Sequence, residues 1–111
     1  MTEGDVVLTP VPQANGQIRN RPAIVLRNMR PYGDLLVCGV STQLNQRVTG
    51  FDEVILPSDM DFGMSGLVSA SLIRLGFLAV LPRTKIAGAI GTILPERHRR
   101  LLMTLSEYLT A

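Results

Sequence analysis

Short apolar segments separated by turn-forming residues recur along most of this chain, and they constrain its fold more than any other feature. Segments of this kind, bounded by proline, glycine, asparagine or aspartate, are typical of β-strands. We expect strands at residues 6–11, 23–28, 35–40, 51–56, 67–74, 78–81 and 86–93. Polar loops at 13–20, 44–50 and 58–66 and a turn at 31–34 separate them. Several short strands at regular spacing predict a small barrel or sandwich.

Prolines and glycines set the limits of these segments. Pro10 and Pro12 are expected to end the first strand. Gly88 and Gly91 have the wrong spacing for a phosphate-binding loop, so they indicate a bend or bulge in the last strand. The segment 23–28 is apolar almost throughout, which predicts a strand that is buried on both faces.

The periodicity changes near the C-terminal end. Seven residues there, most of them apolar, fall on one helical face, namely Leu94, His98, Leu101, Leu102, Leu105, Tyr108 and Leu109. Pro95 suits the first helical turn, and Glu96 complements the positive end of the helix dipole. We therefore expect a mainly β fold with a C-terminal helix packed on it, in a single domain of residues 1–111.

Composition excludes several classes of protein. Hydrophobic residues make up 46% of the chain and charged residues 18%, which argues against disorder. The apolar stretches are too short for a transmembrane helix, and the N-terminus lacks the apolar region of a signal peptide, so we expect a cytoplasmic protein. Cys38 is expected to be a buried small hydrophobe. One histidine, one cysteine and scattered carboxylates predict neither a metal site nor a cofactor.

The basic residues are nearly all arginine, ten of the eleven. The guanidinium fork suits phosphate, although a GC-rich genome would produce the same bias. Four arginines cluster in one stretch and four acids in another, namely Arg19, Arg21, Arg27 and Arg30, and Asp52, Glu53, Asp59 and Asp61. This distribution predicts a basic side and an acidic side.

Arg21 and the segment Ser41-Thr42-Gln43 lie at the ends of two apolar strands. Arginine stabilises negative charge on a phosphoryl group, and hydroxyl and amide groups can hold its oxygens. RNA cleavage needs no metal where the 2′-hydroxyl of the substrate is the nucleophile. We therefore consider a phosphate-handling site without a metal. On spacing alone, a solvated Arg21 and a simple strand end at Ser41 explain the same residues.

An ordered series of motifs resembles the MazF/PemK family of toxin endoribonucleases over nearly the whole chain. Residues 4–7 (GDVV) resemble the first strand of that family, and residues 20–26 (NRPAIVL) resemble its most specific motif, arginine-proline before an apolar strand. Residues 40–43 (VSTQ) resemble the end of its third strand. The later matches are residues 65–67 (SGL), 73–75 (IRL), 86–93 (IAGAIGTI) and 95–96 (PE).

This resemblance implies an SH3-like barrel with a C-terminal helix, a homodimer, and metal-independent, sequence-specific cleavage of single-stranded RNA such as mRNA. It also implies a small antitoxin whose acidic segment covers the RNA groove. By position, Arg21 would stabilise the scissile phosphate, with Ser41 as the catalytic hydroxyl and Thr42 beside it. The candidate RNA-binding residues are Gln17, Arg19, Asn20, Gln43, Ser71 and Arg74.

The chain departs from the family in its acidic residues. Many relatives carry a glutamate in the first loop, but residues 13–20 contain no acid. Ser71 stands where several relatives place an acid before the arginine that Arg74 matches. An obvious general base is therefore missing, so Arg21 must carry more of the work, or turnover is low, or the chain only binds RNA. Proton transfer by a side chain contributes ~10²–10⁴-fold.

Two other functions stay open on the sequence alone. A gyrase-poisoning toxin of the CcdB group has the same barrel but acts through the end of its C-terminal helix. This chain ends in Leu109-Thr110-Ala111, without the aromatic-glycine end of that group. A non-catalytic RNA-binding relative would share the groove without the chemistry. Its candidate base-stacking residues are Tyr32 and Phe51, either of which can equally be packed.

Overall fold

The computed structural model describes residues 1–12 and 14–111. These residues form six strands, two α-helices and two short 3-10 helices. The elements are β1 (Asp5–Pro12), β2 (Ile18–Met29), β3 (Asp34–Ser41), β4 (Glu53–Ile55), α1 (Phe62–Ser65), β5 (Ser71–Leu81), β6 (Gly88–Thr92) and α2 (Pro95–Leu109), with 3-10 helices η1 (Leu44–Gln46) and η2 (Arg83–Lys85).

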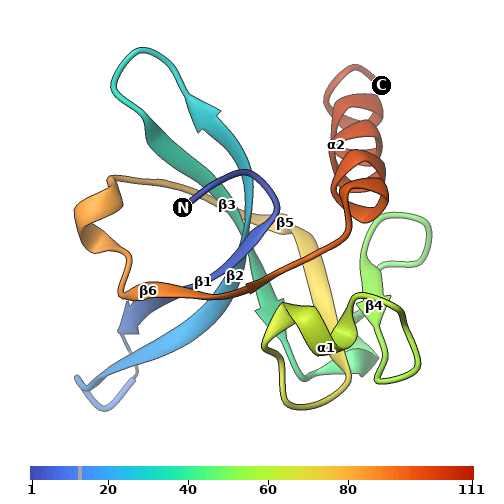
Figure 1. The fold of residues 1–111 in the computed structure, drawn as a ribbon, viewed down its shortest axis with the longest axis horizontal. Coiled ribbons are helices and arrows are strands. Elements are labelled where there is room, and N and C mark those ends of the chain that lie inside the picture. The colour runs from blue at the N-terminus through green and yellow to red at the C-terminus, as the bar shows by residue number, and fades with distance from the viewer. Residues whose placement is uncertain (13) are drawn as a thin grey trace.

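The six strands belong to one antiparallel sheet in the order β4-β5-β3-β2-β1-β6. The sheet curls into half of a barrel, and α2 stands to one side of it (Figure 1). The predicted mainly β fold with a C-terminal helix is confirmed. In the described part of the chain, no helix combines the length and the apolar character needed to cross a membrane.

The middle of β2 forms the centre of the core. β1 and β3 pair with it on either side. Residues 23–26 of the predicted buried strand at 23–28 are all buried, whereas Arg27 and Asn28 are exposed. Because side chains alternate along a strand, Ile24 and Leu26 face one cluster together with Leu101 and Leu105 of α2. Ala23 and Val25 face a second cluster on the other side of the sheet. The helix therefore covers one face, and the second face is available for a site.

The hairpin that joins β1 to β2 is longer than predicted. β1 continues through Pro10 to Pro12, and residues 18–20 of the predicted loop belong to β2. β6 pairs with β1 only as far as Leu8. Beyond that point β1 is an edge strand, where the missing N–H of proline is tolerated. The hairpin projects from the sheet, at the lower left in Figure 1.

β5 is one strand, although the sequence predicted two strands at 67–74 and 78–81. Cys38 of β3 pairs with Leu78, and the next residue, Gly39, pairs with Arg74. Three residues of β5, at positions 75–77, therefore have no partner on β3 and form a bulge. A bulge bends its strand and re-aims the side chains that it carries. β4 is shorter than the predicted strand at 51–56, and it pairs only with the start of β5.

A second irregularity lies where β6 passes α1. Ile90 is unpaired between Ala89 and Gly91, which pair with consecutive residues of β1, so the bulge predicted in this segment is confirmed. Part of the predicted loop at 58–66 is the one-turn helix α1. A Cβ added at Gly91 would lie 2.3 Å from the carbonyl oxygen of Met64. Glycine is therefore required for this close approach.

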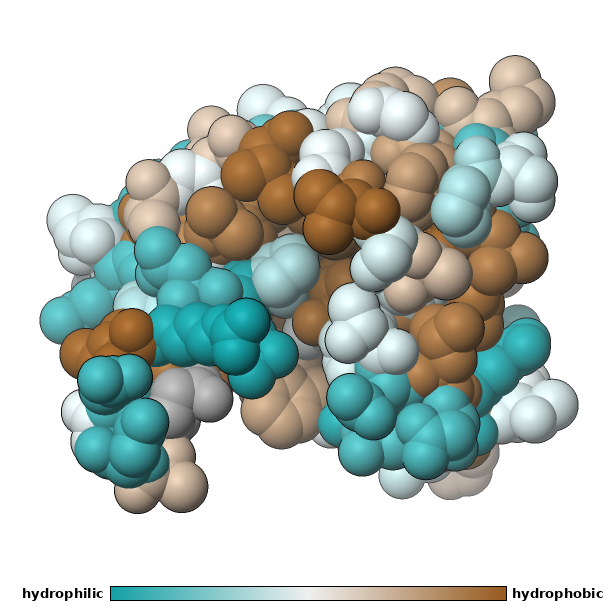
Figure 2. All heavy atoms as spheres, turned by 90° about the horizontal axis from the view of Figure 1, so that it is seen from below, coloured by the Kyte–Doolittle hydropathy of each residue, from teal (hydrophilic) through white to brown (hydrophobic). Residues whose placement is uncertain are grey.

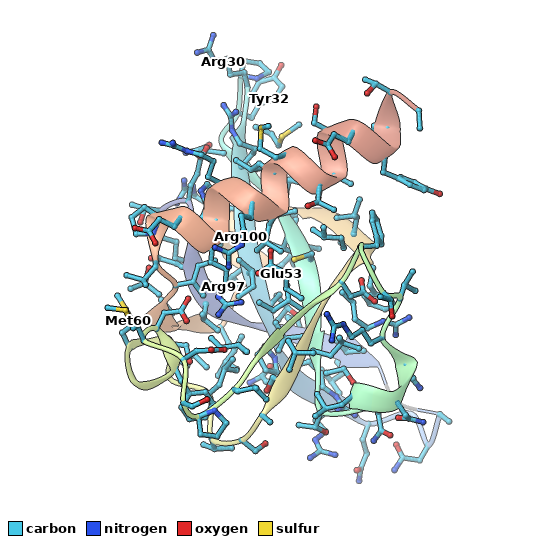
Figure 3. All side chains as sticks on the ribbon, turned by 90° about the vertical axis from the view of Figure 1, so that its right-hand side faces the viewer. Arg30, Tyr32, Glu53, Met60, Arg97 and Arg100 are labelled. Atoms are coloured by element: carbon cyan, nitrogen blue, oxygen red, sulfur yellow. The ribbon has the colours of Figure 1, made fainter. Side chains whose placement is uncertain are left out.

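The expected acidic side is not an open surface. Arg97 of α2 is buried, and its guanidinium donates hydrogen bonds to the carboxylates of Glu53, Asp59 and Asp61. Arg100 also donates a hydrogen bond to Glu53. The side chains of Glu53, Arg97 and Arg100 gather beneath α2 in Figure 3. These acids serve to attach the helix to β4 and to the loop before α1.

Candidate functional site

A groove of about 510 Å³ opens on the side of the sheet that carries the second cluster. Its described lining residues come from β1, β2, β3 and β5 and from the β1–β2 hairpin. In Figure 2, hydrophilic side chains gather on the projecting end of this hairpin, and the surface is hollowed beside it. The charged, hydroxyl-bearing and aromatic residues of the lining are Thr9, Arg21, Ser41, Arg74 and Phe77.

Arg21 lies at the exposed start of β2, just before the buried residues 23–26. Thr9 is its partner on β1, and the Thr9 hydroxyl donates a hydrogen bond to the carbonyl oxygen of Arg21 at 3.2 Å. Pro22 fixes its own φ and favours an extended backbone at the residue before it. These constraints hold the backbone of Arg21 at the groove, and this exposed residue belongs to the groove lining.

Ser41 is the last residue of β3 and also lines the groove. Its Oγ accepts a hydrogen bond from the backbone N–H of Gln43 at 3.0 Å. The hydroxyl proton of Ser41 can therefore be donated to an anionic group. Thr42 and Gln43 follow as exposed residues beyond the strand, and neither is among the described lining residues.

Arg74 comes from β5 and pairs with Gly39 of β3. Its Nη1 donates a hydrogen bond to Oε1 of Gln46 at 3.3 Å. Its guanidinium carbon lies 5.7 Å from the centroid of the Phe77 ring. Two arginine residues thus line the groove, and this arrangement favours an anionic ligand such as a phosphodiester.

The remaining candidates lie outside the groove lining. Gln17, Arg19 and Asn20 are exposed on the hairpin, where Arg19 shares the side of β2 that carries Arg21. Ser71 is only 3% exposed, and its hydroxyl donates to the carbonyl oxygen of Ser69 at 2.8 Å. We therefore do not retain Ser71 as an RNA-contacting residue, because its donor is buried and already used.

The four arginines expected on one basic side separate into two pairs. Arg19 and Arg21 lie at the groove end of β2. Arg27 and Arg30 lie toward the other end of the strand, where the Nε of Arg27 donates to a carboxylate oxygen of Glu3 at 3.0 Å. Only the first pair can contribute charge near the groove.

The sequence analysis does not single out Phe77, because residues 75–77 lie between the strands predicted at 67–74 and 78–81. An aromatic residue just after a glycine within an apolar run is the signal that could have found it. The aromatic residues that the sequence did suggest lie elsewhere. Tyr32 is at the turn that joins β2 to β3, at the top of Figure 3. Phe51 packs against Tyr108, with ring centroids 4.9 Å apart.

Neither a carboxylate nor an imidazole occurs among the described residues that line the groove. His98 lies on the α2 side of the sheet, with Nε2 at 2.8 Å from the carbonyl oxygen of Leu26. Within residues 1–12 and 14–111, no three His, Cys, Asp or Glu side chains gather into a group that could hold a metal ion. The groove can therefore stabilise charge through arginine, and its described lining offers no group that titrates near neutral pH.

Comparisons with known proteins agree with this architecture. A family model described as PemK-like, MazF-like toxin of type II toxin-antitoxin system matches residues 2–109. Among solved structures 37 chains match, and one of them is the Mycobacterium tuberculosis toxin MazF-mt6, with 13% identity, a TM-score of 0.70 and coverage of 96% of each chain. The curated proteins contain no match to this sequence. The chain belongs to the PemK-like, MazF-like toxin family of type II toxin-antitoxin systems.

Proposed function

We propose that this chain is a toxin that cleaves single-stranded RNA without a metal ion. One observation carries the proposal, which is that three strands bring Arg21, Ser41 and Arg74 into one groove. Guanidinium and hydroxyl donors are the groups that hold the charge of a phosphoryl transition state. Membership of a toxin family supports the same activity.

In this reaction the ribose 2′-oxygen attacks the adjacent phosphorus, and the bond from phosphorus to the 5′-oxygen breaks. The products are a 2′,3′-cyclic phosphate and a 5′-hydroxyl end. Arg21 balances the charge that grows on the non-bridging oxygens, Ser41 donates a hydrogen bond to one of them, and Arg74 holds a neighbouring phosphate. Solvent accepts the proton of the 2′-hydroxyl and supplies one to the leaving oxygen, since the described lining offers no carboxylate or imidazole.

The experiment that tests this function is incubation of the purified protein with a long single-stranded RNA in EDTA. Arg21→Ala is the test variant, and Arg99→Ala removes a guanidinium from the exposed surface of α2 as a matched control. We expect discrete fragments with 5′-hydroxyl ends from the wild type and the control. Arg21→Ala should slow cleavage by about 10²–10³-fold, as does loss of one donor to a charged transition state in other enzymes.

Two outcomes would contradict the nuclease proposal. RNA that stays intact with folded wild-type protein would exclude cleavage, and RNA that is bound but uncut would identify a non-catalytic relative. Equal cleavage by the wild type and Arg21→Ala would remove Arg21 from the catalytic site while leaving the activity.

The proposal includes an antitoxin, since the family consists of type II toxins. Arg21 and Arg74 in the groove favour a partner whose docking segment is acidic, because opposite charges across an interface speed association and select the partner. Such a segment would occupy the position of the RNA backbone and inhibit cleavage.

A homodimer is also part of the proposal. Apolar side chains are exposed on β5 at Leu78 and Val80 and on the end of α2 at Tyr108 and Leu109. In the described part of the chain, β4 covers only residues 71–73 of β5, so the rest of that edge has no strand beside it. An apolar strand edge can pair with a second copy about a two-fold axis. Light scattering should give twice the chain mass of 12.1 kDa, and the mass of one chain would contradict the dimer.

A further inference from the structure

Phe77 is the aromatic residue among the described residues that line the groove, and its side chain is 60% exposed. Single exposed apolar side chains are common on protein surfaces and need no explanation by themselves. Phe77 differs from them in its surroundings, because it lines the same groove as Arg21 and Arg74.

The backbones of β5 and β3 hold the ring in this position. Phe77 belongs to the bulge at residues 75–77, which departs from the register with β3. Its side chain lies close to Gly39, where an added Cβ would come within 2.9 Å of the ring Cδ1. Glycine at position 39 leaves room for this side chain. The ring is therefore in place before any ligand arrives.

The positive charge of Arg74 lies over the ring of Phe77. The guanidinium carbon of Arg74 lies 5.7 Å from the ring centroid of Phe77, and Gln46 accepts a hydrogen bond from the same guanidinium. A cation next to an exposed ring suits a nucleotide, since the cation binds the phosphate and the ring stacks on the base.

We propose that Phe77 is the platform on which an unpaired base of the RNA stacks, beside the phosphates held by Arg21 and Arg74. The inference rests on the proposed function and adds a specificity-determining contact to it. Stacking accepts every base but differs in strength among bases, so it imposes a modest base preference. Neither Tyr32, at the far turn, nor Phe51, packed on Tyr108, is placed for this role.

The first test is direct binding of RNA that cannot be cleaved, made with 2′-fluoro groups in place of 2′-hydroxyls. Single-stranded oligomers of uridine, cytidine and adenosine serve as separate ligands. Phe77→Leu keeps an apolar side chain but removes the ring. It should weaken the Kd by about 5- to 150-fold, which corresponds to ~1–3 kcal/mol for one stacked base. Arg99→Ala should bind like the wild type.

A second variant reports on the contact itself. The chain contains no tryptophan, so Phe77→Trp introduces a single fluorescent side chain in the groove. RNA should bind this variant as tightly as the wild type and quench its fluorescence, because a base stacks on the indole. Tyr32→Trp is the matched control, since Tyr32 is 89% exposed at the far turn. Its fluorescence should not change when RNA is added.

The outcomes separate this inference from the function on which it rests. Equal RNA affinity for the wild type and Phe77→Leu, with no quenching in Phe77→Trp, overturns the stacking contact even where the wild type still cuts RNA. A wild type that neither binds nor cuts RNA overturns the proposed function and the stacking contact with it. Unchanged RNA affinity together with a reduced mass of Phe77→Leu in light scattering identifies a protein contact, and this result also overturns the proposal.

Discussion

Loss of the Arg97 guanidinium should destabilise the protein far more than loss of its neighbour Arg100. Nε and Nη2 of Arg97 donate to the two carboxylate oxygens of Asp61 at 2.7 and 3.1 Å, and Nη1 donates to Glu53 at 2.9 Å. Asp61 is only 2% exposed. Arg100 reaches Glu53 as well, but its side chain is 57% exposed to water.

The size of the effect follows from this difference in burial. Breaking a buried ion pair on one side costs about 3–5 kcal/mol, because the other charge stays buried without its partner. An exposed pair contributes ~0–1 kcal/mol. We therefore expect Arg97→Met to cost about 3–5 kcal/mol and Arg100→Met less than about 1 kcal/mol. The free energy of unfolding of a small domain is ~5–15 kcal/mol in total, so Arg97→Met should be close to unfolding.

Urea unfolding followed by circular dichroism at neutral pH measures both variants. The double variant Arg97→Met with Asp61→Asn removes the stranded charge and keeps an acceptor for the N–H of Leu94, which bonds Asp61 at 3.3 Å. It should regain about 1–3 kcal/mol over Arg97→Met alone. Equal losses in Arg97→Met and Arg100→Met, or no recovery in the double variant, would refute the reasoning.

The same cluster predicts a loss of stability in acid. Burial by itself would raise the pKa of Asp61, but hydrogen bonds from Arg97 and from the Leu94 N–H outweigh it and hold this pKa below its usual value. A depressed folded pKa contributes stability above the unfolded pKa of about 3.9, and that stability is lost as the pH falls through the folded pKa. Between about pH 5 and pH 2, the wild type should therefore lose more stability than the double variant.

Three further predictions concern other parts of the molecule. Gly91→Ala should cost about 1–3 kcal/mol or more in urea unfolding, because its Cβ would meet the Met64 carbonyl, whereas Gly63→Ala, with open space around the new Cβ, should be tolerated. The logarithm of the cleavage rate should rise with pH by about one per unit from about pH 6 to 9, and a bell-shaped profile would instead indicate a side-chain base. Burial raises the pKa of the Cys38 thiol to about 12, so iodoacetamide at about pH 8 should modify this thiol only in unfolded protein, and rapid modification of the native chain would contradict its burial.

That Arg21 and Ser41 lie in the same groove could be expected from the sequence, because their placement follows from local rules. Each residue stands at one end of an apolar strand, and the two strands are joined by a short turn at 30–33. In an antiparallel pair joined in this way, the start of the first strand lies beside the end of the second. The turn residues and the apolar runs are visible in the sequence, and so is the pairing.

The buried position of Arg97 could not be expected in the same way. Its partners Glu53, Asp59 and Asp61 lie 36 to 44 residues earlier in the chain. The helical periodicity marks only the apolar face, on which Leu101 follows one turn after Arg97. An arginine at that position is stable only because three carboxylates reach it, and their approach depends on β4 and on the loop before α1. The charged residues can be read from the sequence, but the short distances between Arg97 and its carboxylate partners cannot.

The bulge in β5 explains why a site residue was missed and how the groove acquires two of its side chains. Cys38 pairs with Leu78, so an unbroken register would pair Gly39 with Phe77 and would place Arg74 opposite Thr42, beyond the end of β3. The bulge instead moves Arg74 three positions inward, to Gly39. Because side chains alternate along a strand, shifting the register by an odd number of residues also moves each side chain to the opposite face of the sheet. Arg74 and Phe77, which are an odd number of residues apart and would otherwise face opposite sides, therefore line the same groove.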